Sequence, residues 1–516
     1  MMSTPKEKLA QSLEVLQGLQ DKDGVAIFKA GTISRTHKDR LLINGFIKEV
    51  MKGWYISANP NESKGDSTSW YAAFWKFYGI YLNDRFNNNW CVSPEQSISI
   101  HSGNWTIPKQ LLVRSPKAGN NVTSLVFNTS IVDANLVMPT NKEIIEKNGI
   151  RIFSLPSAFI ACTPNYFVNN STDVRTALST IIDDSAILAP LLDGGNSIVA
   201  GRIAGAFRNI GNTRIADNII KTMKSAGYDI RENDPFKNKL QLNISNREVS
   251  PYINRIKVMW QQMREPVLEC FPKPPGIPKN KIGYLQRVED FYMTDAYHSL
   301  SIEGYKVSTD LIERVMHGEW NPEGNEKDKA QIDALAARGY YLAFEAVKNS
   351  IEKVFSGQNP GKVADEDHGE WYRQMFSPST LAGLLKPSDL AGYRNSQVFI
   401  SQSSHIPLNV QGVRDAMPVL FEMLQNETEP GVRAVLGHFI FVYIHPYLDG
   451  NGRIGRFLMN VMLASGGYPW TVIPLEKRQD YMNALEKASV GQNIEDFAKF
   501  IAGLVSAGMK EGSLIK

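Results

Sequence analysis

The chain has 516 residues, of which 43% are hydrophobic and 21% charged, and its formal net charge is only +3. Such a composition is that of an ordinary folded protein with several cores, and it offers no overall charge with which to attract nucleic acid. Three widely spaced cysteines without a CxxC pair argue against a disulfide scaffold and a zinc site. The N-terminus lacks a signal-peptide core and no apolar run is long enough to cross a bilayer, so we expect a cytoplasmic protein without a membrane segment.

Residues 1–60 are predicted to form a winged helix-turn-helix. Leucines recur at helical spacing over residues 5–17, a second helix is expected over 33–44, and residues 46–56 read as two strands around a turn. The segment carries nine Lys and Arg against six Asp and Glu, which is the whole positive excess of the chain. We therefore expect it to contact DNA phosphates through Arg35, Lys38 and Arg40. A protein-binding domain with a solvated basic face is the alternative.

Residues 61–243 are expected to form a mixed α/β domain of unclear role. Their aromatic cluster, Trp70 to Tyr78, fits a hydrophobic core better than a platform for stacked bases. The proline-rich stretch 271–280 cannot be helical and lies near the start of a third domain, 244–516. Within that domain, apolar residues at helical spacing predict a helix over 283–304 that stops at Gly304. A carboxylate at a helix C-terminus is disfavoured by the dipole, so Glu303 should have a cationic partner.

The most informative stretch is residues 445–456, which read His-Pro-Tyr-Leu-Asp-Gly-Asn-Gly-Arg-Ile-Gly-Arg. His445 supplies a proton acceptor, and Asp449 supplies oxygen for a divalent cation. The glycines on either side of Asn451 let the backbone turn its N–H groups towards an anion, and two arginines follow. Apolar residues at helical spacing flank the stretch on both sides. The pattern predicts two helices joined by a tight glycine loop, with the second helix N-terminus at a phosphate.

This stretch resembles the core motif of the Fic family, His-Pro-Phe-x-Asp-Gly-Asn-Gly-Arg-x-x-Arg, and departs from it only at Tyr447. The resemblance implies a mostly α-helical catalytic domain with a β-hairpin flap, and an ATP- and Mg²⁺-dependent protein adenylyltransferase. His445 would be the catalytic base and Asp449 the metal ligand. The upstream Ser299-x-x-x-Glu303-Gly304 is similar to the family's inhibitory motif, whose glutamate pairs with the second arginine of the core, here Arg456.

The same resemblance extends to the nucleotide and to the target protein. It implies a flap around Val398 that holds the target by added-strand pairing, and a helix near Tyr481 beside the adenosine. Met482 and Ser489 depart from the family pattern in that helix. The residues expected to bind ATP are Glu303, Val398, Phe399, Ile400, Ser401, Asp449, Gly450, Asn451, Gly452, Arg453, Ile454, Gly455, Arg456, Tyr481, Met482 and Ser489.

Several alternatives stay open at this point. Residues 1–60 also resemble the N-terminal winged helix of antitoxin-like regulators of abortive infection. The chain could therefore be a DNA-binding regulator whose C-terminal domain senses nucleotide, or the same site could remove AMP from proteins. The expected partners are a target protein, the chain itself, DNA through residues 1–60, and a second copy in a homo-oligomer.

Overall fold

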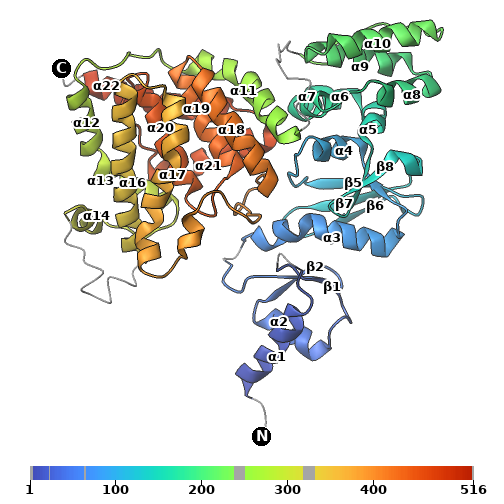
Figure 1. The fold of residues 1–516 in the computed structure, drawn as a ribbon. Coiled ribbons are helices and arrows are strands. Elements are labelled where there is room, and N and C mark those ends of the chain that lie inside the picture. The colour runs from blue at the N-terminus through green and yellow to red at the C-terminus, as the bar shows by residue number, and fades with distance from the viewer. Residues whose placement is uncertain (1–3, 22–23, 63–64, 238–249, 318–331, 514–516) are drawn as a thin grey trace. The chain divides into compact units, whose positions relative to one another are not determined.

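The structure is a computed structural model that describes residues 4–21, 24–62, 65–237, 250–317 and 332–513. The chain divides into two compact units, which are described separately. The first comprises Met1–Pro251 together with Phe399–Ile406, and the second comprises Tyr252–Val398 and Pro407–Lys516. The helices and strands of both are labelled in Figure 1. The predicted boundary between residues 243 and 244 falls outside the described residues. In the described part of the chain, no helix is both long and apolar enough to span a membrane.

The described part of residues 1–60 forms two helices and a three-stranded antiparallel sheet with a small core of their own. The elements are α1 (Pro5–Gln17), β1 (Ile27–Lys29), α2 (Arg35–Ile43), β2 (Ile47–Met51) and β3 (Trp54–Ser57), with strand order β1-β3-β2. Both helices and the β2–β3 hairpin agree with the sequence prediction. A short strand, β1, lies between the two helices, where the helix-turn-helix prediction placed a turn, and its residues 27–29 pair with β3. The winged-helix assignment therefore stays a prediction.

A four-stranded mixed sheet and a long aromatic helix follow in the same unit. Strand order is β4-β5-β7-β6, in which β5 and β7 run parallel and the other pairs antiparallel. The predicted aromatic cluster lies on α3, and Trp70, Phe74, Phe77 and Tyr78 are buried in the core with sheet residues. The elements are α3 (Thr68–Phe86), β4 (Cys91–Val92), α4 (Pro94–His101), β5 (Gln110–Arg114), β6 (Asn121–Ser124), β7 (Ser130–Ala134), η1 (Asn141–Glu143), β8 (Ile144–Lys147) and β9 (Ile150–Phe153).

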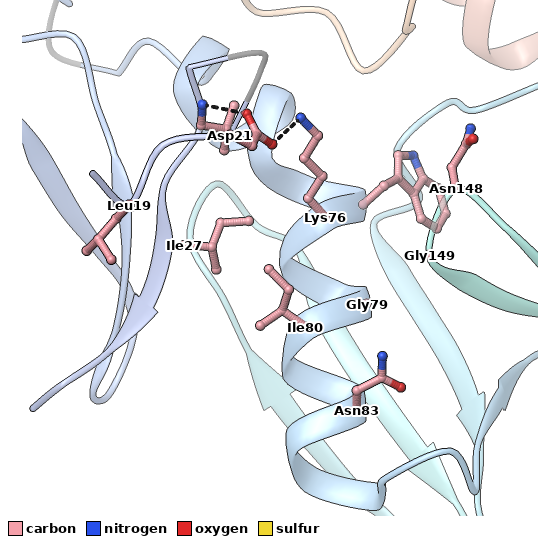
Figure 2. A pocket seen from close by; sticks show the side chains of 11 residues that line it. Leu19, Asp21, Ile27, Lys76, Gly79, Ile80, Asn83, Asn148 and Gly149 are labelled. Atoms are coloured by element: carbon pink, nitrogen blue, oxygen red, sulfur yellow. Dashed lines mark hydrogen bonds and ion pairs between the residues drawn. The ribbon is translucent and has the colours of Figure 1, made fainter. Parts of the chain in front are cut away.

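Six shorter helices complete the described part of this unit: α5 (Leu155–Ala161), α6 (Pro164–Asn169), α7 (Ser171–Ser179), α8 (Ser185–Gly194), α9 (Ser197–Asn209) and α10 (Thr213–Ser225). A pocket of about 390 Å³ lies beside α3 (Figure 2). Lys76 and Asp21 both line this pocket. The Lys76 ammonium donates to the Asp21 carboxylate at 2.7 Å, so the two charges neutralise each other. The pocket contains no residue of the predicted nucleotide site.

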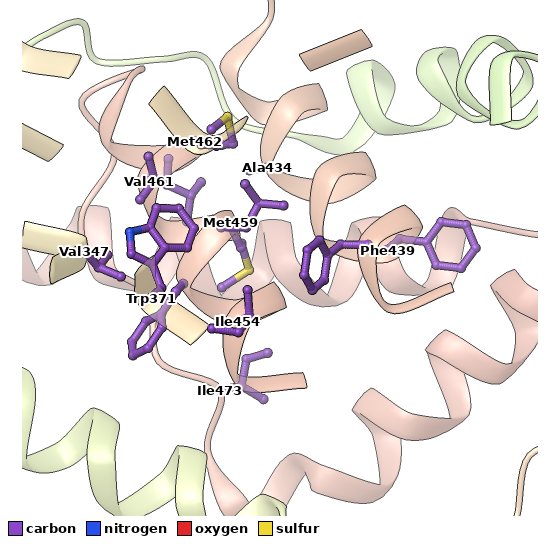
Figure 3. Packing of buried hydrophobic residues seen from close by; sticks show 14 of the residues in the cluster. Val347, Trp371, Ala434, Phe439, Ile454, Met459, Val461, Met462 and Ile473 are labelled. Atoms are coloured by element: carbon purple, nitrogen blue, oxygen red, sulfur yellow. The ribbon is translucent and has the colours of Figure 1, made fainter. Parts of the chain in front are cut away.

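The second unit is almost entirely helical. Its elements are α11 (Pro251–Cys270), α12 (Lys281–Asp290), α13 (Tyr292–Ile302), α14 (Thr309–Met316), α16 (Ile332–Phe355), α17 (Pro360–Leu381), η2 (Pro387–Leu390), α18 (Val410–Asn426), α19 (Pro430–Ile444), α20 (Asn451–Ala464), η3 (Leu475–Lys477), α21 (Arg478–Gly491) and α22 (Glu495–Ser513). Apolar residues of α20 pack against Trp371 of α17 and Val347 of α16 in one continuous core (Figure 3). A rigid α20 is thus held at the centre of the unit.

The predicted helix 283–304 is divided in two at Phe291. Its N–H is shared between the carbonyls of Arg287 and Val288, which tightens one turn and separates α12 from α13. The C-terminal end agrees with the prediction, because Gly304 takes the left-handed conformation at φ +93° and closes the helix. The proline-rich stretch 271–280 is non-helical, as predicted, and joins α11 to α12.

Candidate active site

The predicted glycine loop lies between α19 and α20, and both helices are buried. Helix α19 ends at His445, which adopts the left-handed conformation with φ 55° and ψ 63°. Its N–H still donates to the Phe441 carbonyl at 3.0 Å, so the turn closes the helix while redirecting the chain. A left-handed conformation is uncommon for a residue with a β-carbon and persists where surrounding contacts enforce it. The sequence places a histidine at this strained position.

The protonation state of His445 suits a general base. Burial lowers the pKa of His445 to about 4, so the imidazole is neutral at pH 7. Its Nδ1 lies 3.2 Å from the Val442 carbonyl oxygen. Because a carbonyl can only accept, Nδ1 must carry the proton in that contact, which leaves the lone pair on Nε2. One ring nitrogen thus orients the imidazole and the other is available to take a proton.

The loop after His445 is shaped by Asn451. The Asn451 amide accepts from the Tyr447 N–H and donates to the Tyr447 carbonyl, both at 2.9 Å. Its side chain therefore fixes the loop, and its contact with phosphate stays a prediction. Gly450 caps α20 in the left-handed conformation at φ 80° and no side chain caps this helix. The N–H groups of the first turn, which no intrahelical carbonyl can satisfy, are left for an anion.

Asp449 and Arg453 lie one turn apart at this helix N-terminus. The Asp449 carboxylate is 62% exposed, accepts from the Gly450 N–H at 2.6 Å and lies 3.1 Å from the Arg453 guanidinium. The Arg453 side chain is only 2% exposed, and its guanidinium lies 5.2 Å from the ring centroids of both Tyr305 and Phe376. These two rings hold the cation in place through cation–π contacts. Neither ring was expected from the sequence, because only the fold brings them to Arg453.

The predicted partner of Arg456 is present. Its Nη2 donates to Glu303 Oε1 at 2.7 Å and to the Ser299 carbonyl at 3.1 Å, while Nε donates to Ser299 Oγ at 2.9 Å. The Arg456 side chain is 4% exposed and that of Glu303 26% exposed, so this ion pair is largely shielded from water. Burial opposes ionisation of Glu303, but Arg456 and then Arg453 outweigh it and lower its pKa. The carboxylate is therefore charged at pH 7.

Two buried arginine N–H groups at this site lack a hydrogen-bond partner among the described residues. They are Nε of Arg453 and Nη1 of Arg456. Buried donors are normally satisfied, so unpaired ones mark capacity for a further acceptor. Gly452 leaves space beside them, since a β-carbon there would lie 2.4 Å from Glu303 Oε1 and 3.2 Å from Arg456 Nη1. The site combines a neutral base, a helix N-terminus and two arginines, a donor set suited to a polyphosphate.

Comparison with known proteins agrees with this geometry. Residues 366–463 match the model of the Fic/DOC family. The chain contains a Fic domain. It is 26% identical over 263 residues to the protein adenylyltransferase Fic of Nematostella vectensis, covering 50% of this chain and 57% of that protein. It is 28% identical over 225 residues to the protein of the same name from Drosophila melanogaster, covering 43% of this chain and 42% of that one.

The chain thus spans about half the length of the curated relatives it matches. Among solved structures, Fic-1 of C. elegans (residues 134–508) is similar, with a TM-score of 0.38 and 16% sequence identity. That likeness covers 64% of this chain and 92% of the other.

The predicted flap around Val398 does not form a β-hairpin. Residues 398–400 form no strand; a turn follows, in which the Ser403 N–H donates to the Ile400 carbonyl at 3.2 Å. The two arms at its base, residues 394–398 and 407–408, are bridged by side chains. Pro407 has no N–H to offer a backbone ladder, and Gln397 Nε2 donates to the Pro407 carbonyl at 2.8 Å.

The predicted adenosine side of the Fic domain is mostly buried. Tyr481 is 1% exposed, and its hydroxyl lies 2.8 Å from His438 Nε2, so in this state it belongs to the core. Ser489, also on α21, is buried, and Met482 packs partly against the main core. Ile454 and Gly455 are likewise buried within α20. Nucleotide contact by these residues stays a prediction.

The basic residues predicted to contact DNA are largely engaged within the protein. Arg40 donates to the Lys8 carbonyl and to Ser12 Oγ, both at 2.7 Å, and so ties α2 to α1. Lys38 lies over the Tyr55 ring at 5.6 Å. Arg35 is 91% exposed, with Asp39 3.4 Å away. Of the three residues predicted to contact DNA, Arg35 is the one that is largely exposed, and DNA contact by all three stays a prediction.

Proposed function

We propose that the Fic domain is a protein adenylyltransferase, which moves AMP from ATP to a Ser, Thr or Tyr hydroxyl of a target protein or of the chain itself. The observation that carries the proposal is a neutral His445, with Nε2 available, on the same loop as a phosphate-binding helix N-terminus. The names of the Nematostella and Drosophila relatives support the choice of AMP as the group transferred.

The proton and the phosphate would be handled by separate groups. His445 Nε2 takes the proton from the target hydroxyl while that oxygen attacks the α-phosphorus of ATP. The new oxygen–phosphorus bond forms as the bond to the bridging oxygen of the β-phosphate breaks, and pyrophosphate leaves. The N–H groups at the start of α20 and the Arg453 guanidinium then stabilise charge on the phosphate oxygens. Arg456 would hold the γ-phosphate.

The residues present also fit Mg²⁺. The described residues contain no cluster of three or more metal-ligating side chains, but Mg²⁺ commonly uses one carboxylate together with water and substrate phosphates. Asp449, exposed at the end of the loop, is the carboxylate that would hold it. When bound with ATP, Mg²⁺ would neutralise charge on the phosphates.

Glu303 would keep the enzyme inactive at rest. While it pairs with Arg456, a γ-phosphate at that position loses its cationic partner and meets a carboxylate. ATP can then bind only in a pose unsuited to attack, so release of Glu303 is required for transfer. The extended residues 398–400 would hold the target by pairing with one of its strands.

The test is mass spectrometry of the full chain after incubation with ATP and Mg²⁺, with labelled ATP for quantification. Wild type, Glu303→Gly, and Glu303→Gly combined with His445→Ala are compared. We expect an added AMP in Glu303→Gly, less in wild type and none in the double variant, since the last lacks only the base. Normal labelling of the double variant would remove His445 as the base. Loss of AMP from a protein that was modified beforehand would instead favour removal of AMP as the activity of this site.

DNA binding by residues 1–60 stays a weaker proposal. It would predict that Arg35→Ala lowers the affinity for duplex DNA and its salt dependence. Titration of labelled duplex at several salt concentrations measures both quantities. Salt-independent binding, or no binding, would contradict it.

A further inference from the structure

Arg394 is a buried arginine beside the catalytic loop, and the partners of its guanidinium among the described residues are all backbone carbonyls. It is 2% exposed. Nε donates to the His445 carbonyl at 2.8 Å, Nη1 donates to the Ser396 carbonyl at 2.7 Å, and Nη2 donates to the Leu408 carbonyl. Its own N–H donates to the Pro446 carbonyl at 2.9 Å. One residue therefore holds the chain on both sides of the peptide bond between His445 and Pro446.

These contacts explain how His445 keeps its left-handed conformation. A residue with a β-carbon loses about 1–2 kcal/mol in that region, so the conformation needs support from its surroundings. Nδ1 of His445 is aligned by Val442, and its backbone is held by Arg394. The bond from Nε also brings positive charge to the C-terminal end of α19, where the helix dipole favours a cation.

The same guanidinium closes the base of the flap. Ser396 and Leu408 lie on opposite arms, and Arg394 donates to the carbonyl of each. Gln397 adds a second bridge to Pro407. The two side chains therefore bridge the arms where the described residues form no backbone ladder. A planar guanidinium with donors in fixed directions is suited to spanning three acceptors, whereas an ammonium on a flexible stem is not.

Burying this cation is costly and is not offset by a carboxylate. Arg394 forms no ion pair within 4 Å in the described part of the chain, and burial lowers its pKa to about 10, so it stays charged at pH 7. A buried charge without a counter-ion destabilises a fold unless hydrogen bonds compensate. Stability alone therefore does not account for an arginine here, whereas the geometry of the loop and the flap does.

We propose that Arg394 is a positioning residue that fixes His445 and the two arms at the base of the predicted flap, residues 394–398 and 407–408, in one register, so that a hydroxyl of a target protein lies against Nε2. The proposal rests on the proposed adenylyltransferase activity. Arg394 acts on the side of the site that receives the target protein, because its contacts are with His445, Pro446 and the flap arms. Loss of Arg394 should therefore slow transfer without weakening ATP binding.

The experiment uses the full chain with Glu303→Gly, to which Arg394→Lys or Arg394→Met is added. A misplacement of about 1 Å costs on the order of 100-fold in rate, so we expect kcat to fall by about 10- to 100-fold while KM for ATP is unchanged. Arg394→Lys keeps the charge and is the variant of choice if Arg394→Met does not fold. Millimolar guanidinium should partly restore kcat in Arg394→Ala, because it can occupy the vacated space.

Arg433→Met is the matched control. Arg433 is also buried, and it donates to the Glu427 carbonyl at 2.6 Å and to Ser465 at 2.8 Å. We expect it to lower Tm while kcat stays unchanged at a temperature where it is folded. Unchanged kcat in both Arg394→Lys and Arg394→Met would overturn the inference. An equal fall of kcat in Arg433→Met, or a matching rise of KM for ATP in the Arg394 variants, would also overturn it. Absence of AMP transfer by Glu303→Gly itself would refute the proposed function instead.

Discussion

Removing the Glu303 carboxylate should accelerate AMP transfer by a predictable amount. The bond from Arg456 Nη2 to Glu303 Oε1 is 2.7 Å long and joins two charged groups. Such hydrogen bonds contribute about 1.5–3 kcal/mol, and each 1.4 kcal/mol is tenfold in an equilibrium, so Glu303→Gly should raise the rate by about 10- to 100-fold. Because 26% of the Glu303 side chain is exposed to water, the lower half of that range is expected.

The assay is the initial rate of AMP incorporation from labelled ATP at saturating Mg²⁺. Glu303→Gln gives a graded comparison, because its amide keeps one weaker hydrogen bond to Arg456 and should produce an intermediate rate. Asp310→Asn, a neutralisation at an exposed position on α14, is the control and should leave the rate unchanged. Equal initial rates for wild type and Glu303→Gly would refute the reasoning, since the ion pair would then not limit transfer.

Three further predictions concern the base, the metal and the core. In the Glu303→Gly variant, the rate should stay level as pH falls from 8 towards about 5, because His445 must be neutral to act as the base. The rate should drop only near the His445 pKa of about 4. A tenfold loss of rate by about pH 5.5 would instead indicate an ordinary histidine pKa. Asp449→Asn should raise the Mg²⁺ concentration needed for half-maximal rate, and an unchanged Mg²⁺ titration would contradict its role. Gly339→Ala should destabilise the fold by about 1–3 kcal/mol or more, because its β-carbon would lie 1.9 Å from the Met375 carbonyl oxygen. Gly369→Ala, which meets only the end of a flexible side chain, should change Tm little in a thermal melt.

The parts of the site that the sequence predicted are those encoded by local spacing. His445, Asp449 and Arg453 belong to one short stretch, and the flanking apolar periodicity places that stretch between two buried helices. The pairing of Arg456 with Glu303 spans 153 positions. It could still be predicted, because a carboxylate at a helix C-terminus requires a cation and the resemblance to the Fic family indicated which one.

The parts that escaped prediction depend on tertiary contacts or on local competition. The sequence did not predict that the Asn451 side chain bonds to the Tyr447 backbone and so shapes the loop. A hairpin ladder was expected around Val398, but side chains bridge the arms and no strand forms. Arg394 carries no local signature, because all of its acceptors are carbonyls that only the fold brings together.

The ring of Tyr305 links release of Glu303 to a loss of order in the Arg453 side chain. Tyr305 follows Glu303 by two residues and covers one face of the Arg453 guanidinium, while Phe376 covers another. Any movement that carries Glu303 away from Arg456 also tends to carry Tyr305 away from Arg453, which then regains side-chain freedom worth up to about 2 kcal/mol of entropy. The active form would have to restrain that arginine again when nucleotide binds. Faster turnover and tighter nucleotide binding would therefore not rise together.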